Sequence, residues 1–172
     1  SPAQARDGVA VAVTAIFPLR IALALVELES TQPMLKAAVE AVPHIDITAV
    51  TILTSLSEED LFEIGYANHA LESAVALADL SVRAGAKAIV SSPLEIAAIR
   101  SSVGPAPTII TPGVRPAGTA GSDDQVRTMT PADAIAAGAS YVVIGRPITG
   151  AWSKGASAMS DAAKEIAASI QR

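Results

Sequence analysis

The sequence predicts a parallel β/α fold from two observations. Apolar, β-branched stretches bounded by Gly and Pro alternate with amphipathic stretches along the 172 residues, and such apolar stretches are typical of strands buried on both faces. This strict alternation favours right-handed crossovers that leave neighbouring strands parallel. No repeat or low-complexity linker divides the chain, so we expect a single domain over residues 1–172.

The predicted elements follow one another in order. Five stretches have the composition of strands: residues 21–29, 44–53, 86–92, 107–115 and 141–149. The first is rich in Ala and Leu and would suit a helix equally well. Helices are predicted at residues 34–41, 68–85, 93–103, 130–138 and 160–171, with a further helix-compatible stretch at 8–19.

Capping residues support several of these boundaries. Ser57 precedes three acidic residues, which is typical of an N-cap followed by a negatively charged first turn. Thr130 is placed to cap the helix that Pro131 begins. Gly85 and Gly138 stand just beyond their helices, where a left-handed residue commonly ends a helix.

The composition excludes several classes of function. A net charge of −5 and an aromatic content of 3% argue against general nucleic-acid binding. No apolar run approaches the roughly 18 residues needed to cross a membrane, and no signal segment opens the chain. The absence of cysteine excludes disulfides and thiolate metal sites and fits a cytoplasmic location.

The candidate site lies at the ends of the last two predicted strands. Both strands run into a Gly and an Arg: Gly113 with Arg115, and Gly145 with Arg146. In parallel β/α folds ligands bind at the carboxyl ends of the strands, where glycine lets backbone amides approach an anion and arginine offers a bidentate fork. The pattern therefore predicts half of a phosphate site, with a surface role for Arg146 and a loop role for Arg115 as the alternatives.

Several stretches also resemble orotidine 5′-monophosphate decarboxylases, in the same order and with natural spacing from about residue 33 to 172. Those stretches are Ile47-Thr-Ala-Val-Thr-Ile-Leu-Thr-Ser-Leu56, Thr111-Pro-Gly-Val-Arg-Pro116, Asp124-Gln-Val-Arg127, Met129-Thr-Pro-Ala-Asp133 and Val143-Ile-Gly-Arg-Pro-Ile-Thr149. Residues 1–32 diverge from the family. Since a complete (β/α)₈ barrel takes about 250 residues, the resemblance implies an incomplete (β/α) TIM-type barrel covering its last five units.

The resemblance also implies a ligand and its contacts. The family converts orotidine monophosphate (OMP) to uridine monophosphate (UMP) in pyrimidine biosynthesis without a cofactor or metal. By resemblance, Arg146 and the Gly145 and Arg146 amides contact the 5′-phosphate, and Arg115 lies near it. Gln125 would bridge phosphate and base, with a solvated loop residue as the alternative. Thr54 would lie near the pyrimidine, although a strand-end hydroxyl often caps the next turn.

The family's catalytic array is not found in this sequence. In the family, an Asp-x-Lys-x-x-Asp array supplies a lysine that protonates the carbon as carbon dioxide leaves, flanked by carboxylates. The only lysines here are Lys36, Lys87, Lys154 and Lys164, and none lies in such an array. We therefore assign no catalytic residue.

Three hypotheses follow from this absence. The chain belongs to a decarboxylase whose missing segment is deleted, altered or supplied elsewhere; it is a catalytically silent phosphate- or nucleotide-binding domain; or it works as an assembly unit. In each case we expect a homodimer or larger homo-oligomer, because an open barrel exposes sheet edges.

Other polar residues receive structural interpretations. His44 and His69 lack partners at metal-ligand spacing, so no metal site is predicted. Asp123 and Asp124 form a carboxylate pair for which a solvated loop and acid–base chemistry are both open. We interpret Trp152 as a packing residue, with ligand stacking as the alternative.

Overall fold

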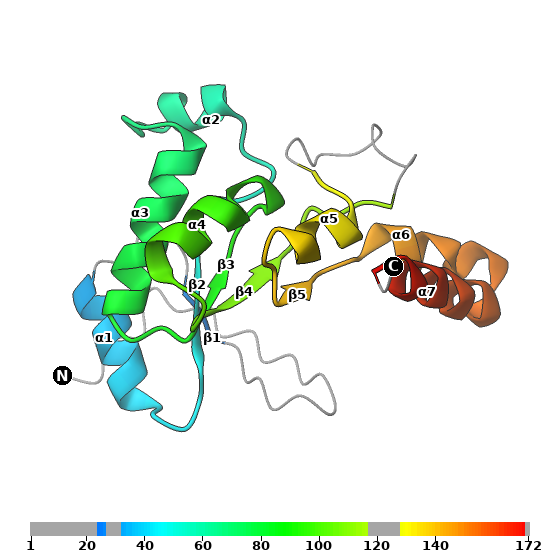
Figure 1. Cartoon of the computed structure of the whole chain (residues 1–172), viewed down its shortest axis with the longest axis horizontal. Coiled ribbons are helices and arrows are strands. Elements are labelled where there is room, and N and C mark those ends of the chain that lie inside the picture. The colour runs from blue at the N-terminus through cyan, green and yellow to red at the C-terminus, as the bar shows by residue number, and fades with distance from the viewer. Residues whose placement is uncertain (1–23, 27–31, 117–127, 171–172) are drawn as a thin grey trace.

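The computed structural model describes residues 24–26, 32–116 and 128–170. Within these ranges a five-stranded sheet lies among helices (Figure 1). The strands are β1 (Ala24–Val26), β2 (Ile47–Val50), β3 (Ala88–Val90), β4 (Thr108–Thr111) and β5 (Tyr141–Val142). The α-helices are α1 (Gln32–Ala41), α2 (Glu58–Glu63), α3 (Ala70–Arg83), α4 (Ile96–Val103), α5 (Pro131–Ala136), α6 (Arg146–Thr149) and α7 (Ala156–Ile170). Two 3₁₀-helices, η2 (Pro93–Glu95) and η3 (Gly150–Lys154), precede α4 and α7.

The order of the strands identifies the type of β/α fold. The sheet runs β1-β2-β3-β4-β5, and every neighbouring pair is parallel. A doubly wound fold reverses its strand order at a switch point, whereas a β/α barrel keeps sequence order around the sheet. Among the described strands, β1 and β5 each pair on one side only, so the sheet is open. The prediction of an incomplete, TIM-type β/α barrel is confirmed.

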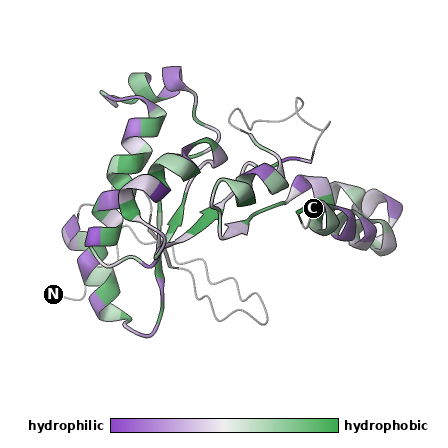
Figure 2. Ribbon diagram, in the orientation of Figure 1, coloured by the Kyte–Doolittle hydropathy of each residue, from purple (hydrophilic) through white to green (hydrophobic). Residues whose placement is uncertain are grey.

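The core fills the space between the sheet and its helices. Ala49, Ile89 and Ile109 are register neighbours on β2, β3 and β4, and their exposed fractions are 2% or less. Because side chains alternate along a strand, Thr48 and Val50 lie on the other face of the sheet. Figure 2 shows the central strands in the hydrophobic colour, as expected of strands covered on both faces.

Helix α3 meets the core through small side chains. Its buried residues are Ala70, Ser73, Ala74, Ala78 and Ser81, and they recur at steps of three and four. Small residues on one stripe let a helix approach its neighbours closely, and α3 packs against both α1 and α4. The predicted long helix over 68–85 is therefore confirmed, two residues shorter at each end.

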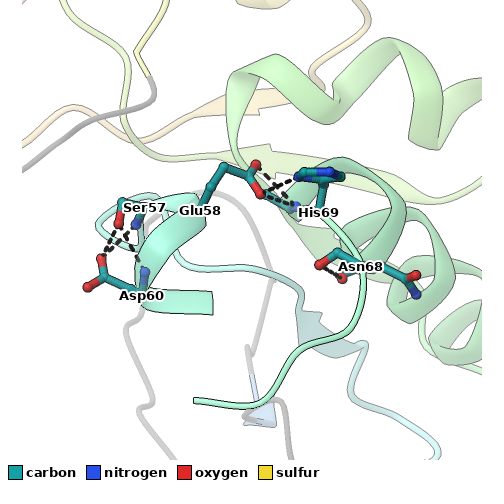
Figure 3. Close-up of polar contacts among 7 residues, drawn as sticks. Ser57, Glu58, Asp60, Asn68 and His69 are labelled. Atoms are coloured by element: carbon teal, nitrogen blue, oxygen red, sulfur yellow. Dashed lines mark hydrogen bonds and ion pairs between the residues drawn. The ribbon is translucent and has the colours of Figure 1, made fainter. Parts of the chain in front are cut away.

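Helix α2 begins with the predicted cap at Ser57. The Ser57 hydroxyl oxygen accepts the Asp60 N–H at 3.1 Å, and the Asp60 carboxylate accepts the Ser57 N–H at 2.8 Å (Figure 3). This reciprocal pair is a capping box, which satisfies backbone donors that the helix itself leaves unpaired. The bonds from the Ser57 backbone and side chain lower the pKa of Asp60 from its ordinary value.

Glu58, in the first turn of α2, contacts the start of α3. Its carboxylate accepts the Ala70 N–H at 3.2 Å and lies 3.0 Å from Nδ1 of His69, the N-cap residue of α3 (Figure 3). The Phe62 ring packs edge-on against the His69 imidazole, with ring centroids 5.3 Å apart. His69 thus lies at the start of α3 and contacts α2, which agrees with a structural interpretation of this residue.

Arg100 connects the amino-terminal ends of β4 and β5. Its guanidinium donates to the carbonyls of Pro107 at 2.6 Å and Gly138 at 3.0 Å, and to the Ser140 hydroxyl at 3.0 Å. Ser140 in turn accepts the Ile109 N–H of β4 at 3.1 Å. One half-buried side chain therefore joins the end of α4, the end of α5 and the two strands that lead to the candidate site.

Two glycines are required by the backbone at helix ends. Gly85 follows α3 with φ +102°, and a Cβ there would lie 3.2 Å from Cγ1 of Val39. Gly138 follows α5 with φ +112°, and its Cβ would lie 3.1 Å from Cγ of Arg100. Both predicted helix-ending glycines are confirmed by these left-handed backbone angles.

The predicted strand over 141–149 is wrong in its second half. Strand β5 covers only Tyr141–Val142, and the chain turns into the short helix α6 at Arg146. Pro147 cannot donate to a strand ladder, and the Ile148 and Thr149 amides donate to the Gly145 carbonyl at 2.9 and 3.0 Å. Arg146 therefore begins a helix rather than ending a strand.

Candidate functional site

The candidate site residues follow the carboxyl ends of three strands. Thr54 comes after β2, Arg115 after β4, and Gly145 with Arg146 after β5. Because the strands are parallel, these ends lie at one edge of the sheet.

Arg115 is held in place by its own backbone. Its exposed fraction is 8%, and its N–H donates to the Met129 carbonyl at 2.9 Å beside the bridge that pairs Val114 with Met129. Its guanidinium Nη1 donates to the Val114 carbonyl at 2.9 Å. A buried guanidinium with a constrained backbone is pre-organised to receive an anion.

Gly145 and Arg146 form the start of α6. Gly145 is the N-cap residue, and Arg146 is the first residue of the helix and is exposed. A Cβ added to Gly145 would meet no described atom within 4 Å, and the φ of Gly145 is negative. Neither packing nor the sign of φ therefore requires glycine at position 145. The open space beside Gly145 leaves room for a ligand to approach the backbone.

The structure brings Arg115 and Arg146 to one cleft of about 630 Å³. The cleft is bounded by segments after β4 and β5 and by helices α5 and α7. Its lining residues are Arg115, Pro116, Thr130, Pro131, Ala132, Arg146, Pro147, Ala162, Glu165, Ile166 and Ser169. Two guanidinium groups on one cleft match the requirement of a phosphate, which accepts several charge-assisted hydrogen bonds.

Among the described residues, the predicted site residue Thr54 is not brought to this cleft. Thr54 is buried, with an exposed fraction of 6%, and is not among the lining residues. Gln125 lies outside the residues that the structure describes, as do Asp123 and Asp124. A role for Thr54 or Gln125 at a nucleotide base stays a prediction.

The sequence did not predict that α7 lines one side of the cleft. Ala162, Glu165, Ile166 and Ser169 lie at steps of three and four, so they occupy one face of the helix. The spacing is visible in the sequence, but only the packing of α7 against α5 and α6 shows that this face meets the arginines.

None of the lysines lines the cleft. Lys36 is exposed on α1, and Lys154 ends η3. Lys87 precedes β3, and its N–H donates to the Ile47 carbonyl at the amino-terminal end of the sheet. Lys164 on α7 lies 3.3 Å from Asp161.

Carboxylates and imidazoles do not gather into a metal site in the described part of the chain. No group of three His, Asp or Glu side chains there could hold an ion. His44 is exposed, and His69 contacts Glu58.

Trp152, which we expected to pack, has an exposed fraction of 62%, so the structure contradicts that interpretation. It lies on η3, whose short helical turn leaves the ring outside the core.

Comparison with known proteins gives the family context. Residues 9–160 match the model of the Orotidine 5′-phosphate decarboxylase / HUMPS family. The chain is 52% identical to the orotidine 5′-phosphate decarboxylase of Thermobifida fusca over 81% of this chain and 57% of that protein. It is 43% identical to the Frankia casuarinae enzyme over 90% of this chain and 56% of that protein. The chain thus spans little more than half the length of these relatives.

A solved structure shows the same arrangement of elements. The crystal structure of orotidine 5′-phosphate decarboxylase from Lactobacillus acidophilus superposes with a TM-score of 0.66 at 29% identity. The match covers 84% of this chain and 62% of that one.

Proposed function

Because the chain belongs to the orotidine 5′-phosphate decarboxylase family, we propose that its cleft binds the 5′-phosphate of a pyrimidine nucleotide such as OMP or UMP. The observation that supports this proposal is the meeting of Arg115 and Arg146 at one cleft beyond the carboxyl ends of β4 and β5. The ligand end of a parallel β/α sheet, a glycine with open space around it, and paired guanidiniums are the features that phosphate recognition uses.

The proposed role is nucleotide recognition within the family's reaction, the decarboxylation of OMP to UMP. We propose a silent binding role for this chain, because none of its four lysines lies in an Asp-x-Lys-x-x-Asp array like that of the family. Decarboxylation leaves an electron pair on carbon that must be stabilised and then protonated, and a nearby ammonium does both. A chain with the phosphate-binding part alone would bind the nucleotide and leave the carboxylate in place.

We further propose that the protein is cytoplasmic and forms a homodimer or larger homo-oligomer. No described helix has the length and apolar content to cross a bilayer. In the described sheet, β1 and β5 present unpaired edges that invite association.

Calorimetric titration of UMP into the wild-type chain and Arg146→Ala tests the binding proposal. Arg146→Ala should weaken UMP binding by roughly 1.5–3 kcal/mol, the size of a hydrogen bond to a charged group. Uridine, which lacks the phosphate, should bind both proteins equally weakly. Arg83→Ala removes an exposed arginine from α3, outside the cleft, and serves as the matched control. Equal UMP affinity for wild-type and Arg146→Ala would exclude this site.

A further inference from the structure

Among the described residues that line the cleft, one charged side chain would repel a phosphate. Its lining residues include three charged groups, namely Arg115, Arg146 and Glu165. Glu165 comes from α7 and is exposed. It takes part in none of the ion pairs within 4.0 Å among the described residues. No described basic residue therefore neutralises its carboxylate by a direct salt bridge, and an anion in the cleft would experience its charge.

The two described hydroxyl groups that line the cleft do not offset this charge. The Ser169 hydroxyl donates to the Ile166 carbonyl at 2.7 Å, and the Thr130 hydroxyl donates to the Asp133 carboxylate at 2.6 Å. Both hydroxyl hydrogens are thus used within their own helices. The α7 side of the cleft otherwise presents Ala162 and Ile166, which are apolar. This wall repels negative charge and offers no ready donor to an additional phosphate.

The repulsion depends on how much charge the ligand carries. A phosphate monoester carries about −1.5 to −2 charges at neutral pH. A diphosphate carries roughly one charge more, so the Glu165 carboxylate disfavours it more strongly than a monophosphate. In a solvated cleft, one extra unit charge several ångströms from a carboxylate changes affinity by roughly 3–10-fold.

From this arrangement we infer that Glu165 is a specificity-determining residue, which favours nucleoside monophosphates over nucleoside diphosphates. This role of Glu165 rests on the proposed phosphate site and adds to it a preference for one phosphate group over two. Arg115 and Arg146 attract the first phosphate, and Glu165 disfavours the second.

The test measures the affinities of UMP and UDP for the wild-type chain and for Glu165→Gln, by calorimetry at low ionic strength without divalent cations. The substitution keeps the size and helix propensity of the side chain and removes its charge. We expect Glu165→Gln to bind UDP about 10-fold more tightly and UMP about 3-fold more tightly, so the preference for UMP narrows about 3-fold. Raising the ionic strength should reduce this difference.

Asp161→Asn is the matched control, because it removes one negative charge from the same helix at a position that does not line the cleft. Its preference for UMP over UDP should equal that of the wild-type chain. If wild-type binds UMP and Glu165→Gln keeps the same preference, or if Asp161→Asn narrows it equally, the inference is wrong while the phosphate site stands. If wild-type binds no UMP, the proposed function fails and the inference fails with it.

Discussion

Two arginines differ in their position in the fold, which supports a structural role for Arg100 and the proposed ligand-binding role for Arg146. Arg100 is half-buried, and its donors go to backbone carbonyls and a hydroxyl at the amino-terminal ends of β4 and β5. Arg146 is exposed at the opposite end of β5 and lines a cleft. A guanidinium has five N–H donors in a rigid fork, so it can donate to several carbonyls or bind an anion. The elements around it determine which of these partners it meets.

Arg100→Ala should destabilise the fold by roughly 1.5–3 kcal/mol, because carbonyls of two loops lose a charged donor. Arg100→Lys should recover less than half of this loss, since an ammonium cannot span the same acceptors. Urea denaturation measures both free energies of unfolding. Arg83→Ala breaks an exposed pair with Asp79 at 2.7 Å and should cost only about 0.3–0.5 kcal/mol. An Arg100→Ala loss no larger than that of Arg83→Ala would contradict the structural role.

At the scale of elements, the sequence predicted those whose local signals agree with their packing. Helix α3 has both an amphipathic repeat and a terminal glycine, and β3 and β4 are apolar runs paired on both sides. Strand β5 has a similar apolar run, yet among described strands it pairs only with β4. The ladder with β4 ends at Val142, well before Pro147, so pairing and not composition determined where that strand stops.

The site was predictable from the sequence only in part. Gly-Arg at strand ends indicates phosphate chemistry, and the structure brings Arg115 and Arg146 to one cleft. The contribution of α7 was not predictable, because helical spacing defines a face of α7 but not the elements that it meets. Glu165 became a candidate only through that tertiary contact.

The cap of α2 gives a pH prediction at the element scale. The hydrogen bonds from Ser57 lower the pKa of Asp60 in the folded state. The Asp60 carboxylate therefore stabilises the fold fully above pH 3.8, the ordinary pKa of the unfolded chain. This stabilisation is lost as the pH falls through the lowered pKa of the folded state. Asp60→Asn should therefore lower the melting temperature more at about pH 6 than at about pH 3. Glu63→Gln, at the other end of α2, removes a charge without touching the cap. A melting difference for Asp60→Asn that does not change between the two pH values would contradict this account.

At the scale of the whole molecule, the open sheet predicts association. Strand β5 is unpaired on one side among the described strands, and Tyr141 and Val143 beside that edge have exposed fractions of 41% and 51%. Unpaired backbone groups next to exposed apolar side chains favour pairing with another chain. Light scattering at micromolar concentration should give at least twice the chain mass of 17.4 kDa. Val143→Lys should shift the mass toward the monomer, and a monomeric wild-type chain would refute the prediction.

Catalysis is the property for which family membership and the residues of this chain disagree. The family name leads one to expect decarboxylation, but the reaction needs a cation beside the carbon that loses its carboxylate. Lys87 lies at the amino-terminal end of the sheet, Lys36 is exposed on α1, and neither Lys154 nor Lys164 lines the cleft. Binding energy from the phosphate accelerates a reaction only when it positions the substrate against reactive groups.

We therefore expect the isolated chain to bind UMP and to consume OMP no faster than the uncatalysed background, measured as loss of OMP absorbance. Lys154→Ala, the lysine after the last strand, should behave as the wild-type chain does. Turnover by the wild-type chain that Lys154→Ala abolishes would show that this lysine reaches the substrate and would overturn the prediction.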